Sequence, residues 1–99
     1  MVHRQLVYDV ITGERVYQAG RWNKDTTESG GVHTVTEWLL YMQDYLTEAI
    51  NVVSRNPDPE AKKMALDIIR KITAMGVACM EQNGIVARKL LPITIQLKG

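Results

Sequence analysis

Two runs of sequence determine the fold of this chain: TVTEWLLYMQDYLTEAINVV at residues 34–53 and PEAKKMALDIIRKITAMGVACMEQN at residues 59–83. In both runs, apolar residues recur at the three- or four-residue spacing of an amphipathic α-helix. A short polar link, SRNPDPE at residues 54–60, connects them. So short a connection implies that the two helices are antiparallel neighbours.

Both predicted helices carry sequence signals at their ends. Thr34 is followed three residues later by Glu37, which is the spacing of a capping box. Asp58 suits the N-cap of the second helix and Pro59 its first helical position. The Asn-Gly pair ending at Gly84 matches a left-handed C-terminal cap. These signals place the helices at about 34–53 and 59–83.

The flanking segments predict strands and a loop. Residues 4–18, RQLVYDVITGERVYQ, alternate in polarity and are rich in Val, Ile and Tyr, with a Thr-Gly turn signal at Gly13, so we predict a β-hairpin. The run PITIQL at residues 92–97 predicts a short C-terminal strand. The expected fold is therefore one α+β domain over residues 1–99. Its parts are a β-hairpin (1–19), a loop (20–33), a helical hairpin (34–88) and a C-terminal strand or tail (89–99).

Composition limits the partners and the setting. The formal net charge is only +1, so charge gives no general reason to expect nucleic acid as a partner. The single cysteine, Cys79, cannot form an intramolecular disulfide, which suits a reducing compartment. No apolar run approaches the roughly 20 residues that cross a bilayer. We therefore expect a cytoplasmic protein without a membrane partner.

The second predicted helix is apolar nearly all round from Ile72 to Met80. A helix that hides every face in so small a chain is expected to be covered by a second copy. Ala74, Gly76 and Ala78 would permit close approach of that copy. We therefore expect a homo-oligomer, either a dimer or a larger assembly.

Acidic and basic residues are sorted between the two helices. Asp44 and Glu48 lie four residues apart on the first helix, where like charges repel by a few tenths of a kcal/mol. A divalent cation such as Mg²⁺ would neutralise them. The basic half of the second helix would also do so, with Glu48 level with Lys63, and Asp44 level with Asp67 and Arg70. The residues alone leave both explanations open.

Three segments resemble a known group of proteins. These are YQAGRWN at 17–23, HTVTEWLLYMQDYLTEA at 33–49 and ALDIIRKITAMGVACMEQNGIVAR at 65–88. They are similar to small phage and prophage proteins related to the all-α nucleoside-triphosphate pyrophosphohydrolases, the MazG-like superfamily. The resemblance covers about residues 17–88. It implies an oligomer of antiparallel helices that hydrolyses a nucleoside triphosphate to monophosphate and pyrophosphate, with Mg²⁺ held by Glu-Glu-x-x-Glu on one helix and Glu-x-x-Asp on the next.

This chain departs from that acidic pattern. Asp44 and Glu48 on the first helix, and Asp67 on the second, are the acids that can be matched to metal ligands. Arg70 stands three residues after Asp67, where the second acid belongs. A guanidinium at this place competes with Mg²⁺ for the remaining carboxylates.

The same replacements predict direct binding of phosphate. Lys63, Arg70 and Lys71 would hold a phosphate through bidentate hydrogen bonds and point charges. Trp22 and Tyr45 would stack on the base. Such a site would bind a nucleotide without a cofactor and without catalytic residues.

Three hypotheses about function follow. The first is a non-catalytic, phage-type nucleotide-binding protein, for which the family context suggests the sequestering of a nucleotide-derived defence signal in the host cytoplasm. The second is a Mg²⁺-dependent pyrophosphohydrolase that uses Asp44, Glu48 and Asp67. The third is a small structural or partner-binding oligomeric protein in which these charges form salt bridges between the helices.

Overall fold

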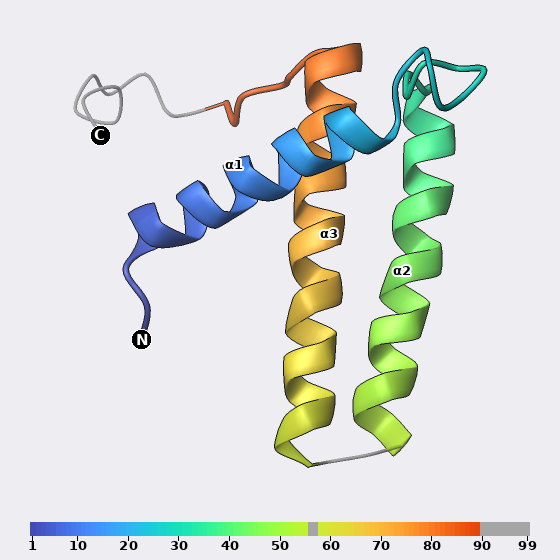
Figure 1. Ribbon diagram of the computed structural model, residues 1–99. Helices are drawn as coiled ribbons and strands as arrows, with labels where there is room; N and C mark the ends of the chain where they lie inside the picture. Colours follow the sequence, from blue (N-terminus) through green and yellow to red (C-terminus); the bar gives the residue numbers. More distant parts are fainter. Residues whose placement is uncertain (56–57, 90–99) are drawn as a thin grey trace.

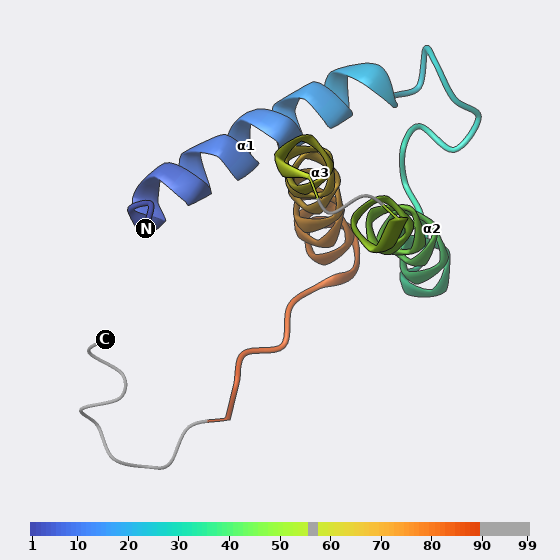
Figure 2. The ribbon, with the colours of Figure 1, turned by 90° about the horizontal axis from the view of Figure 1, so that it is seen from below.

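The computed structural model describes residues 1–55 and 58–89 of the chain. This part forms three helices: α1 (Arg4–Arg21), α2 (Val35–Arg55) and α3 (Pro59–Asn83) (Figure 1). α2 and α3 lie antiparallel and side by side. α1 crosses the C-terminal half of α3 and makes no contact with α2 (Figures 1 and 2).

The predicted β-hairpin is wrong, because residues 4–18 belong to α1. The spacing of this segment also fits a helix: the apolar Val7 and Ile11 and the buried Gln18 fall at i, i+4 and i+11 and share one face. Thr12, taken as part of a turn, donates from Oγ1 to the carbonyl of Tyr8 at 3.0 Å, a bond made within helices. The described residues therefore form an all-helical fold and not an α+β fold. The strand predicted at 92–97 lies outside the described residues.

The two antiparallel helices are confirmed, and the N-terminal caps of both form as expected. Thr34 donates its backbone N–H to Oε1 of Glu37 at 2.9 Å, and Glu37 donates its own N–H to Oγ1 of Thr34 at 3.1 Å. Asp58 Oδ1 accepts from the backbone N–H groups of the second and third residues of α3, at 2.8 and 3.0 Å. Gly84, with φ of 102°, ends α3 and donates its N–H to the carbonyl of Met80.

The core is small and lies between α2 and α3. One cluster joins Trp38, Met75 and Ala78, and a second joins Ala49, Ala65 and Ile68. Ala74 and Ala78 are completely buried within the single chain. These small residues therefore allow close packing between helices of the same chain.

Many larger apolar side chains stay exposed outside this core, on all three helices. None of the helices in the described part of the chain is both long and apolar enough to span a membrane.

Candidate ligand-binding cleft

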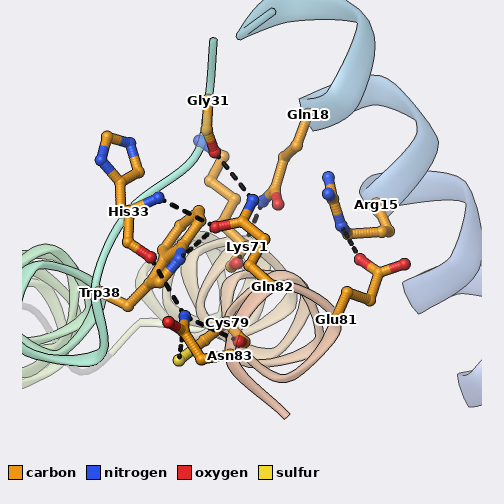
Figure 3. A network of polar contacts seen from close by, with 10 residues as sticks. All are labelled: Arg15, Gln18, Gly31, His33, Trp38, Lys71, Cys79, Glu81, Gln82 and Asn83. Carbon is orange, nitrogen blue, oxygen red and sulfur yellow. Dashed lines mark hydrogen bonds and ion pairs between the residues drawn. The ribbon is translucent and has the colours of Figure 1, made fainter. Parts of the chain in front are cut away.

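The last turn of α3 fastens the loop that leads from α1 to α2. The Oε1 atom of Gln82 accepts from the backbone N–H of His33 at 3.0 Å and from Nε1 of Trp38 at 2.8 Å, and its Nε2 donates to the carbonyl of Gly31 at 2.9 Å (Figure 3). The neighbouring Asn83 donates from Nδ2 to the carbonyl of His33 at 3.1 Å. The end of the loop is thereby held at a fixed place beside α3.

The loop also closes on its own beginning. Gly31 has φ of 78°, a conformation that favours glycine, and a Cβ atom at this position would overlap the carbonyl of Trp22. At the start of the loop, the N–H of Asn23 donates to Oγ1 of Thr26, which in turn donates to the carbonyl of Arg21. Trp22 and Gly31 therefore lie close together, although eight residues separate them in the sequence.

An aromatic cluster lies where this loop enters α2. The ring of His33 meets the rings of Trp38 and Tyr41 edge-on, each with centroids 5.0 Å apart. Trp38 and Tyr41 themselves pack edge-on at 6.3 Å. Such edge-to-face contacts stabilise each pair by about 0.5–1.5 kcal/mol beyond the burial of area.

These elements enclose a cleft of about 670 Å³. Its walls come from the end of α1, the loop, the first half of α2 and two residues of α3. Five aromatic side chains line it: Trp22, His33, Trp38, Tyr41 and Tyr45. A volume of this size lies within the range of about 300–1,000 Å³ that is typical of small-molecule sites.

The charged groups of the cleft are mostly acidic. Glu28, Glu37 and Asp44 line it, and Arg15 is the one Lys or Arg among the described residues that does so. Arg15 is already paired through Nε with Oε1 of Glu81 at 2.6 Å. Hydrogen bonds from Thr34, first from its backbone, lower the pKa of Glu37 below its ordinary value, so this carboxylate is ionised at neutral pH. The cleft therefore favours ligand groups that donate hydrogen bonds.

Gln18 supplies a buried acceptor at the cleft. Its side chain is almost fully buried, and its Nε2 donates to the carbonyl of Lys71 at 3.2 Å and to Oε2 of Glu14 at 3.4 Å. Both partners are acceptors, so the amide cannot be turned over without losing these bonds. Its Oε1 is buried and accepts no hydrogen bond from residues 1–55 or 58–89. Leaving such an acceptor unpaired costs about 1–3 kcal/mol.

The structure brings only some of the predicted site residues together. Trp22 and Tyr45 both line the cleft. Lys63, Arg70 and Lys71 do not line it. The predicted rings and the predicted phosphate-binding cations therefore do not form one site in this part of the chain.

Each of those three cations has a carboxylate partner. Arg70 donates from Nε to Oε1 of Glu14 at 2.9 Å and also pairs with Asp67, and both interactions raise its pKa, that with Glu14 more strongly. Lys71 pairs with Asp67 at 3.4 Å. Lys63 pairs with Glu60, the residue three positions earlier, at 3.4 Å.

The predicted metal ligands are likewise apart. Asp44 and Glu48 line a shallow hollow between the second half of α2 and the first turns of α3. Asp67 is instead paired with Arg70 and Lys71. Over residues 1–55 and 58–89, no three His, Cys, Asp or Glu side chains are grouped so that they could hold a metal ion. Within the same residues, neither Asp44 nor Glu48 forms an ion pair, so the expected pairing of Glu48 with Lys63 is not made.

The sequence reasoning missed three residues that shape the cleft. Arg15 and Gln18 belong to the segment for which the sequence predicts a β-hairpin. Gln82 is one of several polar residues on a long predicted helix. The one available signal for Arg15 and Gln18 was their helical spacing from Ile11, at i+4 and i+7. Nothing in the sequence indicates that Gln82 reaches the loop.

Comparison with known proteins finds no matching family model, no significantly similar curated protein and no significantly similar solved structure.

Proposed function

We propose that this protein is a non-catalytic binding protein whose cleft takes up the base of a nucleotide or nucleoside. The observation that carries this proposal is the cleft of about 670 Å³ walled by five aromatic side chains. Stacking of a base on such rings contributes about 1–3 kcal/mol per base and suits any base, because every base has a π-face.

The polar groups of the cleft suit the edge of a base. Exocyclic amino groups and ring N–H groups are donors, and the ionised Glu37, together with Asp44, offers acceptors to them. Gln18 adds an amide oxygen that has no hydrogen-bond partner among the described residues. A donor that reached this atom, after a small shift of the side chains covering it, would remove the cost of leaving it unpaired.

The phosphates contribute less in this proposal than the base does. Arg15 is the only cation on the cleft walls within the described residues, and it is already paired with Glu81. The cations expected to hold phosphate lie elsewhere and are paired with carboxylates. We therefore expect the affinity to come mainly from the base.

Two considerations favour retention of the ligand over hydrolysis. Asp67, a ligand in the hydrolytic hypothesis, is bound by both Arg70 and Lys71, and these bonds lower its pKa, led by the bond from Arg70. A carboxylate engaged in this way is a poor partner for Mg²⁺. The resemblance to MazG-related phage proteins supports the choice of a nucleotide as ligand, and retention of an intact compound would suit the sequestering of a nucleotide-derived signal.

The test is to mix the purified protein with nucleosides, nucleoside triphosphates and cyclic dinucleotides in the presence of Mg²⁺, to remove the protein by filtration, and to separate the remaining compounds by chromatography. We expect one class of base to be depleted and then recovered intact when the retained protein is heated. The Kd of the nucleoside should be at most about tenfold higher than that of its triphosphate, a difference of no more than about 1.4 kcal/mol.

Two variants form the matched control. Trp22→Ala removes a ring from the cleft, whereas Tyr17→Ala removes a ring from the exposed surface of α1 outside it. We expect Trp22→Ala to weaken retention at least about tenfold and Tyr17→Ala to leave it unchanged. Appearance of monophosphate and pyrophosphate would establish the hydrolytic alternative instead, and the absence of any depletion would remove the proposal.

A further inference from the structure

One side of α2 carries a stripe of apolar side chains that no other helix of the described residues covers. Its members recur at the three- and four-residue spacing of one helix side. Each is 44–58% exposed: Val35, Leu39, Leu46, Ile50 and Val53. The partly buried Met42 continues the stripe between Leu39 and Leu46.

α3 carries a second such stripe. Leu66, Ile69 and Met80 are each about half exposed, and Gly76 lies among them at the same spacing. These residues point away from α1, which bonds to the other side of α3 through Arg70, Lys71 and Glu81.

The two stripes meet to form one surface. Cε of Met42 lies 3.9 Å from the position that a Cβ of Gly76 would occupy, so the edges of the two stripes are in contact. Among the residues that the structure describes, Figure 2 shows α1 on one side of the helical hairpin and no helix on the opposite side, where residues 84–89 leave α3. We call this surface the open face. Its members are Val35, Leu39, Met42, Leu46, Ile50 and Val53 of α2, and Leu66, Ile69, Gly76 and Met80 of α3.

The border of the open face is uncharged along α2. Thr36, Gln43, Thr47 and Ser54 occupy the next positions around the helix, while the acids Asp44 and Glu48 lie farther round. A helix side that faces water normally carries charged residues. Polar but uncharged residues around an apolar centre are instead the pattern of a surface that is covered by a protein partner.

We propose that the open face is the interface of a homodimer, in which the α2–α3 hairpins of two copies pack face to face as four helices. This proposal does not depend on the ligand of the cleft. Eight half-exposed apolar side chains supply on the order of 800 Å², which is one side of a standard protein–protein interface. Apart from Lys62, which lies one turn before Leu66 on the same side of α3, this surface carries no charge, and an apolar surface is complementary to itself, as an interface around a twofold axis must be. Gly76 lets the facing helices approach closely.

A second copy fits this surface better than a single extended segment does. An extended segment laid on two helices leaves its own backbone N–H and C=O groups without partners, and such groups are rarely buried unpaired. A second helical hairpin has satisfied its backbone groups internally and buries both stripes at once. The interface also differs from the one expected from sequence, because Ala74 and Ala78 are buried inside the chain.

Sedimentation equilibrium of the full chain tests the proposal with two matched variants. Leu39 and Leu40 are the same residue type, adjacent on α2 and both 58% exposed, but Leu40 points about 100° away from the open face. The wild-type protein should sediment at twice its 11.2 kDa mass at micromolar concentration. Leu39→Asp should raise the dimer Kd at least about tenfold, and Leu40→Asp should change it by less than about threefold.

A second measurement needs no variant. The melting temperature of a wild-type dimer rises with protein concentration, because dissociation accompanies unfolding. A wild-type mass of 11.2 kDa at about 100 µM, with a melting temperature independent of concentration, would overturn the proposal. Equal effects of Leu39→Asp and Leu40→Asp on the Kd would also overturn it. If the protein were monomeric and Leu39→Asp lowered its stability, the open face would be covered from within the chain.

Discussion

Arg70 of α3 donates from Nε to Oε1 of Glu14 of α1 at 2.9 Å, a contact across 56 residues of sequence. The Glu14 carboxylate is nearly buried, and Arg70 also holds Asp67 on its own helix. This pair, together with the contact between Arg15 and Glu81, fixes α1 across α3. The same guanidinium that the sequence offers for phosphate therefore already has a structural partner.

Removal of this pair should loosen α1. We expect Glu14→Ala to lower the free energy of unfolding by about 1–2 kcal/mol, since a charge-assisted hydrogen bond is lost at a partly exposed site. Urea denaturation followed by circular dichroism measures the change. Glu60→Ala is the control, because Glu60 pairs with Lys63 at the exposed surface, and it should change stability by less than about 0.5 kcal/mol. Equal losses in the two variants would contradict a special role for Glu14.

Arg70→Ala separates structural pairing from phosphate binding. In the proposed function, this variant loses stability but keeps its affinity for the retained compound within about twofold, a difference below 0.5 kcal/mol. Isothermal titration of the nucleoside and of its triphosphate measures both affinities. A tenfold or larger loss confined to the triphosphate, about 1.4 kcal/mol, would instead support the phosphate site predicted from Lys63, Arg70 and Lys71.

Two glycines should respond to alanine in opposite directions. Gly31→Ala places a Cβ against the carbonyl of Trp22 in a backbone conformation that favours glycine, so we expect a loss of at least about 1 kcal/mol. Gly13 lies inside α1 with nothing within 4 Å of its Cβ position, so Gly13→Ala should stabilise by about 0.5–1 kcal/mol. Thermal unfolding of the two variants checks both signs. A Gly31→Ala protein as stable as wild type would show that the loop does not need this conformation.

The capping box should make the start of α2 sensitive to acid. The folded-state pKa of Glu37 is lowered from its ordinary value of 4.5, so the stability that it contributes is present above pH 4.5 and is lost as pH falls through the lower, folded pKa. Carboxyl chemical shifts in an NMR titration should place this pKa below 4.5. Thr34→Ala removes a side-chain hydrogen bond that contributes to the shift, and should move the pKa back toward 4.5. An unchanged pKa in that variant would exclude a contribution from the hydroxyl.

The sequence allowed α2 and α3 to be predicted because their signals are local. A capping box or an N-cap aspartate involves residues within one turn, so Thr34 and Asp58 mark helix starts regardless of the remaining fold. α1 could not be assigned in this way. Its residues alternate in polarity and also recur at helical spacing, and the choice is made by the contacts of Glu14 and Gln18 with α3.

The candidate cleft was only half predictable for a related reason. Trp22 and Tyr45 stand out as aromatic residues, and both line it. The acceptor on Gln18 and the attachment of the loop through Gln82 depend on three elements meeting, which no spacing within one element encodes. Lys63 and Arg70 stand out by charge, and their partners Glu60 and Asp67 lie three residues earlier on the same helix. The contact of Arg70 with Glu14 becomes visible only when α1 is placed against α3.

The attachment of the loop by Gln82 and Asn83 has a mechanical consequence. Both residues belong to the final turn of α3, and the chain leaves that turn at Gly84. Fraying of one helical turn would release the loop, so occupancy of the cleft and order in this turn share one equilibrium. A molecule that bound residues 84–89 and unwound the turn would weaken the ligand's hold, and the ligand would weaken that molecule's hold by the same factor. Unwinding of the last turn of α3 would therefore promote release of a ligand from the cleft.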